Sequence, residues 1–301
     1  MRRRDFLKAG AASAALFAAA DRLPSGAAVV RNHRQGDRQG ARMKLGLVTY
    51  NIASDWDLPT LIQRCRDTGY EGVELRTTHA HGVEPDISAE RRREVRSMFQ
   101  DSGVTLWGLG TACDYHRNDP AIVRENIELT KRFCELARDV GATGVKVRPN
   151  GLVEGVPEEK TLEQIGMALR ECGQAAADNG VEIWLEVHGH ETQHPPRIRR
   201  IMDVCGHASV GVCWNSNPTD VKDGSVREYF ELLRPFIRSC HITELANDYP
   251  WRELFSLLRS AGYDRYTLQE IQPLAGTKDP KDIERFMRYY RALWAALQPV
   301  E

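Results

Sequence analysis

From Lys44 onward, short apolar runs alternate with longer amphipathic stretches. The amphipathic stretches repeat apolar residues every three or four positions, which is the period of a helix packed against a core. Several end in glycine just before the next apolar run, as at Gly69 and Gly180, and glycine commonly ends helices. The pattern predicts helices over 58–69, 121–142 and 162–180, and strands over 44–50, 72–76, 104–110, 144–149, 181–187, 210–215, 237–243 and 266–271.

Eight strand–helix units in about 255 residues are typical of a (β/α)8 barrel, whose strands are all parallel. A doubly wound sheet of eight strands is the structural alternative, but it usually carries a glycine-rich phosphate turn after its first strand. Residues 48–55 contain no such turn. We therefore expect an α/β protein with a single (β/α)8 TIM barrel domain over residues 43–298.

Polarity alternates along the predicted strands. Every second residue places Glu74 and Arg76 on one face of the second strand, and Lys146 and Arg148 on one face of the fourth. The opposite faces are aliphatic, as is needed against the outer helices. The polar faces carry charge towards the carboxyl ends of the strands, where active sites of TIM barrels lie.

The N-terminal segment resembles an export signal. Arg3-Arg4 begins a twin-arginine pattern, and the Ala-rich stretch 9–20 that follows is too short to span a membrane. We expect a signal segment over 1–27, a linker over 28–42, and export by the twin-arginine route to the periplasm or another extracytoplasmic space. If Met43 is the true start, the protein is cytoplasmic. No stable membrane span is expected.

Charge and cysteine content exclude several classes of protein. The 301-residue chain has a formal net charge of −1, but residues 1–42 hold more basic than acidic residues and residues 43–301 have an excess of acidic ones. No basic run offers a footprint for nucleic acid, and we expect no nucleic-acid partner. The seven cysteines form no CxxC pair and are odd in number, so we predict neither a disulfide framework nor a zinc finger.

Metal-binding residue types stand at the ends of three predicted strands. They are Glu186, His241 and Glu270, and Asn215 holds the equivalent place in a fourth strand. A carboxylate in a strand buried on both faces needs a partner, and one metal ion shared by several strand ends satisfies all of them. Oxygen donors with one imidazole suit Mn²⁺, Mg²⁺, Co²⁺ or Zn²⁺. The sequence therefore predicts a divalent metal ion, of uncertain identity, as cofactor.

Four motifs carry a family resemblance. They are GYEGVELR at 69–76, LEVHG at 185–189, CHITEL at 240–245 and the segment 248–271, which begins DYPWRELF and ends YTLQEI. With this spacing the chain resembles the xylose isomerase-like TIM barrel superfamily over residues 43–298. Within it, the chain is most similar to the sugar phosphate isomerase/epimerase group.

The resemblance implies a metal held by Glu, Asp, His and Glu from the fifth to eighth strands. These positions correspond to Glu186, Asn215, His241 and Glu270, and Asn215 is a departure from the usual Asp. It also implies proton transfer beside a carbonyl, with Glu186 and Glu270 as catalytic residues on two sides of the metal. The expected function is a metal-dependent isomerase or epimerase that acts on a small-molecule carbohydrate through an enediolate.

Other functions remain open at this stage. The same enolisation serves an exported lyase or hydrolase of 3-keto-glycosides, and a non-catalytic sugar-binding barrel would result if Asn215 has disabled turnover. A nuclease of the endonuclease IV type is disfavoured, because residues 244–248 contain no Asp-x-His pair. The sequence does not define the oligomeric state.

Further polar and aromatic residues are candidates for substrate binding. For Trp251 the alternative role is packing in the core. For Lys146 and Arg148 it is ion pairing with Glu74 or Glu182. The resemblance suggests that His188 contacts a substrate hydroxyl. The alternative is that His188 holds a metal ligand in place without touching the metal itself. The predicted substrate contacts are His188, Lys146, Arg148, Glu74, His81 and Trp251.

Overall fold

The computed structural model describes residues 42–271, 277 and 279–299. The predicted signal segment, 1–27, and all but the last residue of the predicted linker, 28–42, lie outside the described residues.

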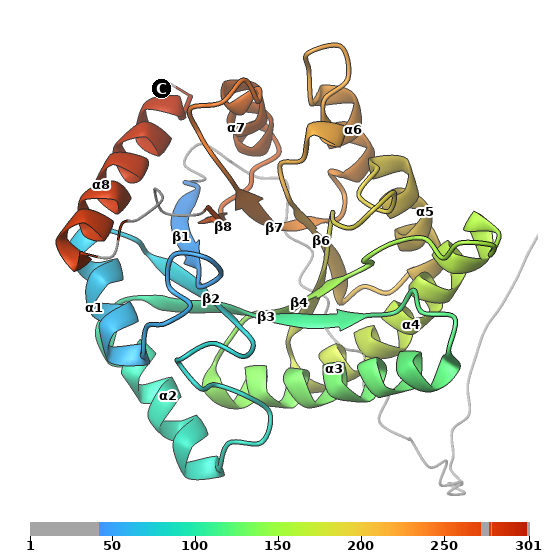
Figure 1. Cartoon of the computed structure of the whole chain (residues 1–301), viewed down its shortest axis with the longest axis horizontal. Coiled ribbons are helices and arrows are strands. Elements are labelled where there is room, and N and C mark those ends of the chain that lie inside the picture. Colours follow the sequence, from blue (N-terminus) through green and yellow to red (C-terminus); the bar gives the residue numbers. More distant parts are fainter. Residues whose placement is uncertain (1–41, 272–276, 278, 300–301) are drawn as a thin grey trace, which may run out of the picture. The chain divides into compact units, whose positions relative to one another are not determined.

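Eight parallel strands close into a barrel in chain order, with β8 paired to β1 (Figure 1). This arrangement confirms the predicted (β/α)8 fold. All eight predicted strands are present, and β3 runs four residues past its predicted end. The strands are β1 Lys44–Val48, β2 Gly72–Arg76, β3 Thr105–Asp114, β4 Gly144–Arg148, β5 Glu182–Glu186, β6 Val210–Trp214, β7 Ile237–Ile242 and β8 Tyr266–Gln269.

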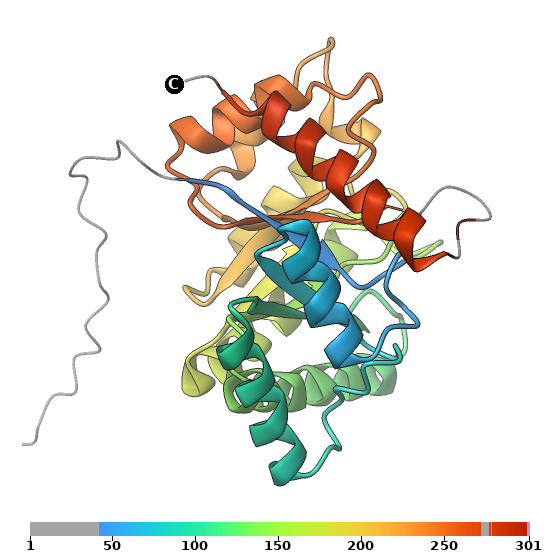
Figure 2. The same cartoon turned by 90° about the vertical axis from the view of Figure 1, so that its left-hand side faces the viewer.

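Helices cover the outside of the barrel. Figure 2 shows α8, α1 and α2 following one another around it. Amphipathic faces hold them there: α7, for example, buries Leu254, Leu257 and Leu258. The helices are α1 Leu58–Thr68, α2 Ala89–Ser102, α3 Pro120–Val140, α4 Glu158–Asn179, α5 Pro195–Cys205, α6 Arg227–Leu233, α7 Trp251–Ser260 and α8 Pro280–Leu297, with a 3-10 turn η1 at Pro218–Asp220. Among the residues that the structure describes, no helix is both long and apolar enough to cross a membrane.

Aromatic side chains fill the amino-terminal end of the barrel interior. The Trp107 and Trp184 rings stack with centroids 4.9 Å apart, and Tyr266 lies 5.0 Å from Trp107. Glycines in neighbouring strands make room, since a Cβ on Gly108 of β3 or Gly144 of β4 would lie 2.6 Å from the Trp184 ring. This end of the interior is therefore packed with aromatic rings, which leaves the other end for an active site.

The backbone is strained at the opposite, carboxyl end of the strands. Thr78, Glu191 and Ser216 follow β2, β5 and β6 and have φ values of 67°, 64° and 48°. Left-handed conformations cost about 1–2 kcal/mol each for such residues. A hydrogen bond of 2.8 Å from Ser216 Oγ to the His241 carbonyl helps to hold one of them. Strain of this kind often accompanies functional sites, and Ser216 directly follows the predicted metal ligand Asn215.

Candidate active site

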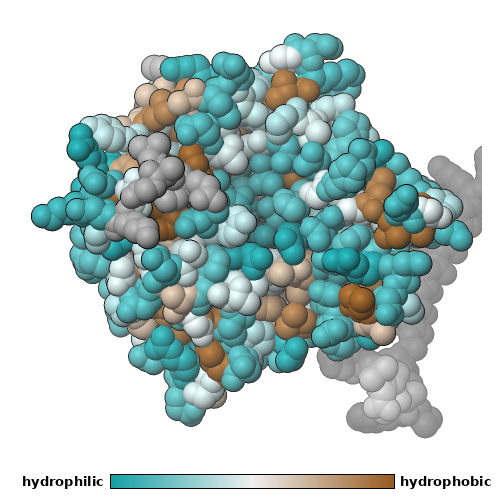
Figure 3. Space-filling model, in the orientation of Figure 1, coloured by the Kyte–Doolittle hydropathy of each residue, from teal (hydrophilic) through white to brown (hydrophobic). Residues whose placement is uncertain are grey.

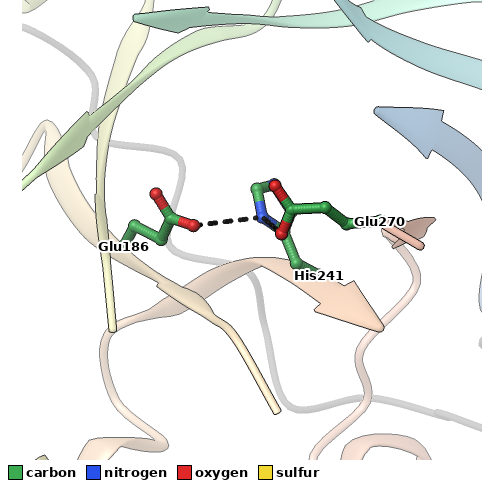
Figure 4. A group of neighbouring side chains, drawn as sticks. All are labelled: Glu186, His241 and Glu270. Carbon is green, nitrogen blue, oxygen red and sulfur yellow. Dashed lines mark ion pairs between the residues drawn. The ribbon is translucent and has the colours of Figure 1, made fainter. Parts of the chain in front are cut away.

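Three side chains from different strands meet inside the carboxyl end of the barrel. Figure 4 shows Glu186, from the end of β5, and Glu270, just after β8, extending from two sides towards His241 of β7. His241 Nδ1 lies 3.5 Å from Glu186 Oε1 and 3.2 Å from Glu270 Oε2. One ligand atom from each residue lies within 4.8 Å of the others. The barrel thus brings these three predicted metal ligands together.

Asn215 offers a fourth donor next to this group. It directly follows β6, is 8% exposed and lines the same cavity as Glu186 and Glu270. Its Oδ1 atom is buried and has no hydrogen-bond partner among the described residues. A buried carbonyl oxygen without a partner is costly, so this atom is suited to a ligand that would bind it.

Glu74 lies behind the imidazole of His241. Its Oε2 atom is 3.2 Å from His241 Nε2, and both side chains are fully buried. Glu74 does not line the cavity, so its placement does not support the predicted substrate contact. Glu74 at Nε2 instead orients the His241 ring and makes its other nitrogen, Nδ1, a better metal ligand.

Lys146 forms a buried ion pair with Glu186. Its Nζ atom lies 2.8 Å from Glu186 Oε2, and the two side chains are 4% and 3% exposed. The structure thus shows an ion pair, but with a different carboxylate from those expected, Glu74 and Glu182. Glu182 is the amino-terminal residue of β5 and pairs with Arg265 at 2.7 Å, whereas Glu186 is the carboxyl-terminal residue and lies within reach of Lys146.

Mutual charge stabilisation keeps the buried groups ionised. Burial alone would raise the pKa of the Glu186 carboxyl, but Lys146 and His241 hold it well below its usual range. Burial alone would lower the pKa of Lys146, but the neighbouring carboxylates raise it. Glu186 is therefore a carboxylate and Lys146 an ammonium at neutral pH.

A cavity of about 710 Å³ opens onto Glu186 and Glu270. Five amide side chains and two tyrosines are among its lining residues, and these groups can hydrogen-bond to a ligand rich in hydroxyl groups. Figure 3 shows a largely hydrophilic face with only scattered hydrophobic patches. The remaining lining residues are Tyr50, Asn51, His188, Gln193, Asn215, Ser216, Asn217, Pro218, Val221, Thr243, Asn247, Asp248 and Tyr249. Apart from His188 and Asn215, this wall was not predicted; the one available signal was that loops after the strands build the active sites of TIM barrels.

Among the other predicted substrate contacts, His188 lines the cavity. Its Nδ1 atom is buried without a hydrogen-bond partner in the described chain, and burial lowers its pKa, so the ring is neutral. A role for His188 in binding substrate therefore stays a prediction with a suitable geometry. Arg148, in contrast, does not line the cavity and donates to the Ala112 carbonyl at 3.0 Å.

His81 and Trp251 lie outside the cavity lining. The His81 ring is held by backbone atoms on both sides: Nε2 lies 2.8 Å from the Arg76 carbonyl, and the Val83 amide donates to Nδ1. The Trp251 side chain is buried in α7, and its Nε1 donates to the Glu244 carbonyl and to Asn247. Their placement does not support the predicted substrate contacts, because local backbone groups already satisfy both rings.

Asp220 joins two walls of the cavity. It is fully buried in η1, where its Oδ2 atom accepts from the Asn217 amide at 2.7 Å and from the Tyr249 hydroxyl at 3.3 Å. Burial raises the pKa of Asp220 to about 7, although these hydrogen bonds partly oppose it. The carboxyl therefore links the loops after β6 and β7 and titrates near neutral pH.

We expect Asp220 to make the protein less stable as pH rises. Its pKa is raised on folding, so its stabilising contribution is complete below the unfolded value near 4 and is lost as pH rises through about 7. Between pH 5 and 8 it should reduce the free energy of unfolding by about 3 kcal/mol. Asp220→Asn should remove this part of the pH dependence in urea unfolding. Asp203→Asn, an exposed control paired with Arg199, should not.

A family model settles the relationship of the chain. Residues 62–293 match the model of the xylose isomerase-like TIM barrel. The chain belongs to the xylose isomerase-like TIM barrel family. The resemblance noted from the sequence is thereby confirmed, and the metal-type residues at 186, 241 and 270 all fall inside the matched region.

Proteins of similar sequence or fold include sugar epimerases. Fructoselysine 3-epimerase of Shigella flexneri is 19% identical over 259 residues, which cover 75% of this chain and 90% of that protein. The structure of the 3-keto-D-glucoside 4-epimerase of E. coli aligns with a TM-score of 0.69 at 17% identity, over 85% and 99% of the two chains. The IolI protein, solved with a zinc atom, aligns with a TM-score of 0.71 at 17% identity, over 86% and 100%. The structural likenesses establish the shared fold, and the named relatives support the predicted isomerase or epimerase class.

Proposed function

We propose that this protein is a divalent-metal-dependent epimerase or isomerase of a sugar or keto-sugar, and that it works by proton transfer through an enediolate of the substrate. The observation that carries the proposal is the pair Glu186 and Glu270, two carboxylates on two sides of His241 that both line one cavity. Carboxylates so placed can remove a proton from one face of a carbon and return one to the other.

The residues present fit a divalent metal ion. Two carboxylates and an imidazole lie close together, and the buried Oδ1 atom of Asn215 lacks a hydrogen bond within the described chain. His241 is oriented by Glu74 on its far nitrogen, as metal-bound histidines usually are. Hard oxygen donors with one imidazole favour Mn²⁺, Mg²⁺, Co²⁺ or Zn²⁺, and a structural neighbour was solved with zinc.

The chain's own residues divide the chemistry between them. A metal held by Glu186, Asn215, His241 and Glu270 would act as a Lewis acid that eases loss of a proton beside the substrate carbonyl. Glu270 pairs with no Lys or Arg in the described chain and stands at the cavity wall, so it is placed to exchange a proton with substrate. Glu186 presents Oε1 towards His241 while Lys146 holds Oε2. His188 and the amide-rich loops would orient the hydroxyl groups.

Solvent exchange tests the proposed enolisation directly. The full chain with Mn²⁺, incubated in deuterated water with a panel of ketohexoses and 3-keto-glucosides, should incorporate deuterium at the carbon beside the carbonyl of at least one substrate, as NMR would show. Treatment with a chelator should abolish exchange, and added Mn²⁺ should restore it. The variant His241→Ala should show no exchange at any metal concentration. Exchange that survives both metal removal and His241→Ala would contradict the proposal.

An exported lyase or hydrolase of 3-keto-glycosides is the second candidate. A single hexose would fill on the order of a third of the cavity, which leaves room for a glycoside. Similarity in fold to a 3-keto-D-glucoside 4-epimerase and the predicted signal point the same way. Release of the aglycone, rather than formation of an epimer, would identify this activity in the same NMR experiment. Bound metal without deuterium exchange on any substrate would instead support the non-catalytic sugar-binding barrel.

Export also stays a proposal. It is based on Arg3-Arg4 and the Ala-rich stretch at 9–20, which lie outside the described residues. Fractionation of cells that express the full chain would test it, and a purely cytoplasmic protein would favour a start at Met43.

A further inference from the structure

The buried ammonium of Lys146 is an unusual neighbour for a metal ligand. It lies 2.8 Å from Glu186 Oε2 and is almost fully enclosed. Glu186 Oε1, the other oxygen of the same carboxylate, faces His241 Nδ1. The two oxygens of Glu186 thus have different roles. Lys146 binds Oε2, and Oε1 is available to the predicted metal.

The charges of the buried centre can be counted. Glu74, Glu186 and Glu270 surround His241 and supply three carboxylates. Arg76 and Arg148, at the ends of β2 and β4, are partly exposed and donate to backbone carbonyls; Arg76 also interacts electrostatically with Glu186 and Glu74, but neither arginine forms an ion pair with a carboxylate of this group. Lys146 is therefore the enclosed cation that this group keeps when a metal binds, because the buried imidazole of His241 must be neutral to act as a ligand. Together with one divalent ion, it would bring the centre to neutrality.

The neutral side chain of Asn215 is consistent with this balance of charges. A carboxylate at this position would add a fourth negative charge to a centre that Lys146 and a divalent ion already balance. An amide contributes a donor oxygen, Oδ1, without that charge. Uncompensated charge in a buried site is costly, which gives a physical reason for finding a lysine and an amide in one centre.

We propose that Lys146 is a permanent second cation of the metal centre: it positions Glu186 through one oxygen and balances Glu74, so that the amide of Asn215 completes the donor set in place of a carboxylate. The inference rests on the metal of the proposed function. It makes Lys146 a positioning residue rather than a substrate contact. It also implies that the wild-type protein binds its metal less tightly than the same site would without Lys146, because two cations repel within one buried centre.

Metal affinity of Lys146 variants tests this inference. In calorimetric titration of the full chain with Mn²⁺ alone, Lys146→Met and Lys146→Gln should both lower the dissociation constant by about tenfold. Agreement between the two variants would identify charge as the cause, because Gln keeps a hydrogen-bond donor and Met does not. The matched control Lys131→Met removes the surface pair of Lys131 with Glu171, also 2.8 Å long, and should leave the constant unchanged. Unchanged or weaker binding in both folded Lys146 variants would overturn the inference.

Asn215→Asp provides a second test that leaves Lys146 in place, in case the lysine variants do not fold. The added carboxylate should lower the melting temperature of the metal-free protein, and saturating Mn²⁺ should raise it by more than in wild type. A metal-free melting temperature equal to or above that of wild type would contradict the charge balance. Failure of the wild type to bind Mn²⁺, Co²⁺, Zn²⁺ or Mg²⁺ would contradict the proposed function instead. If binding then appeared only in the Lys146 variants, the role of Lys146 would still stand.

Discussion

Replacing Glu270 by Gln should reduce turnover by about a thousandfold, because Gln has nearly the same shape as Glu but cannot accept a proton. Glu270 suits this test better than Glu186. Its only ion-pair partner in the described chain is His241, whereas Glu186→Gln would also leave the buried Lys146 without its carboxylate. The Glu270 side chain is 17% exposed, so the substitution should change the melting temperature little.

Deuterium exchange per molecule of bound metal is the measurement that checks this result, since it separates loss of the base from loss of the metal. Glu244→Gln is the matched control: Glu244 also follows a barrel strand but is exposed and lies outside the cavity lining. It should retain wild-type turnover. Wild-type exchange by a metal-loaded Glu270→Gln variant would exclude Glu270 as the base and leave Glu186 or His188 to be tested.

Replacing Trp184 by Ala should destabilise the protein by about 3–5 kcal/mol, the usual cost of emptying the place of a buried aromatic side chain. The Trp184 ring is fully buried against Trp107, and its Nε1 donates to Glu182 Oε2 at 2.7 Å. The closed ring of barrel strands encloses this cluster, so the barrel has little freedom to collapse into the space. A fall in the melting temperature of about 10 °C is expected for a domain of this size.

Thermal unfolding followed by circular dichroism measures this effect, and Tyr289→Ala is the control. Tyr289 is also aromatic but is 64% exposed on α8, so its removal should change the melting temperature by no more than about 2 °C. A loss below about 3 °C for Trp184→Ala would mean that the amino-terminal end of the barrel repacks, against the dense packing described here. The Glu270 and Trp184 predictions together separate a carboxyl end that serves chemistry from an amino end that serves stability.

Much of the candidate site was predictable because it depends on strand order alone. In a closed parallel barrel, residues at the carboxyl ends of strands must converge, whatever the loops do. Glu186, Asn215, His241 and Glu270 each stand at or just after a strand end, so recognising the strands was enough to group them. The strands themselves were visible because apolar runs and amphipathic helices have different periods.

Residues that depend on local loop structure could not be placed in this way. His81 and Trp251 follow β2 and β7, as a substrate contact would, yet their ring nitrogens bind backbone atoms within seven residues in the chain. The cavity wall formed by Asn217, Asn247 and Tyr249 depends equally on loop conformation. Sequence periodicity carries no information about either, because loops have no repeating pattern of burial.

The sequence by itself determined the barrel and the end of the barrel at which polar chemistry collects, since both follow from periodicity and strand order, and its motifs indicated the family by resemblance. Only the tertiary structure decided which charged groups pair inside the barrel. Glu74 meets His241 across 167 residues of chain, and Lys146 meets Glu186 across 40. Such partners are chosen by strand register and by the closing of β8 onto β1, which set the distances between side chains in the barrel interior. No local pattern of residues encodes those distances.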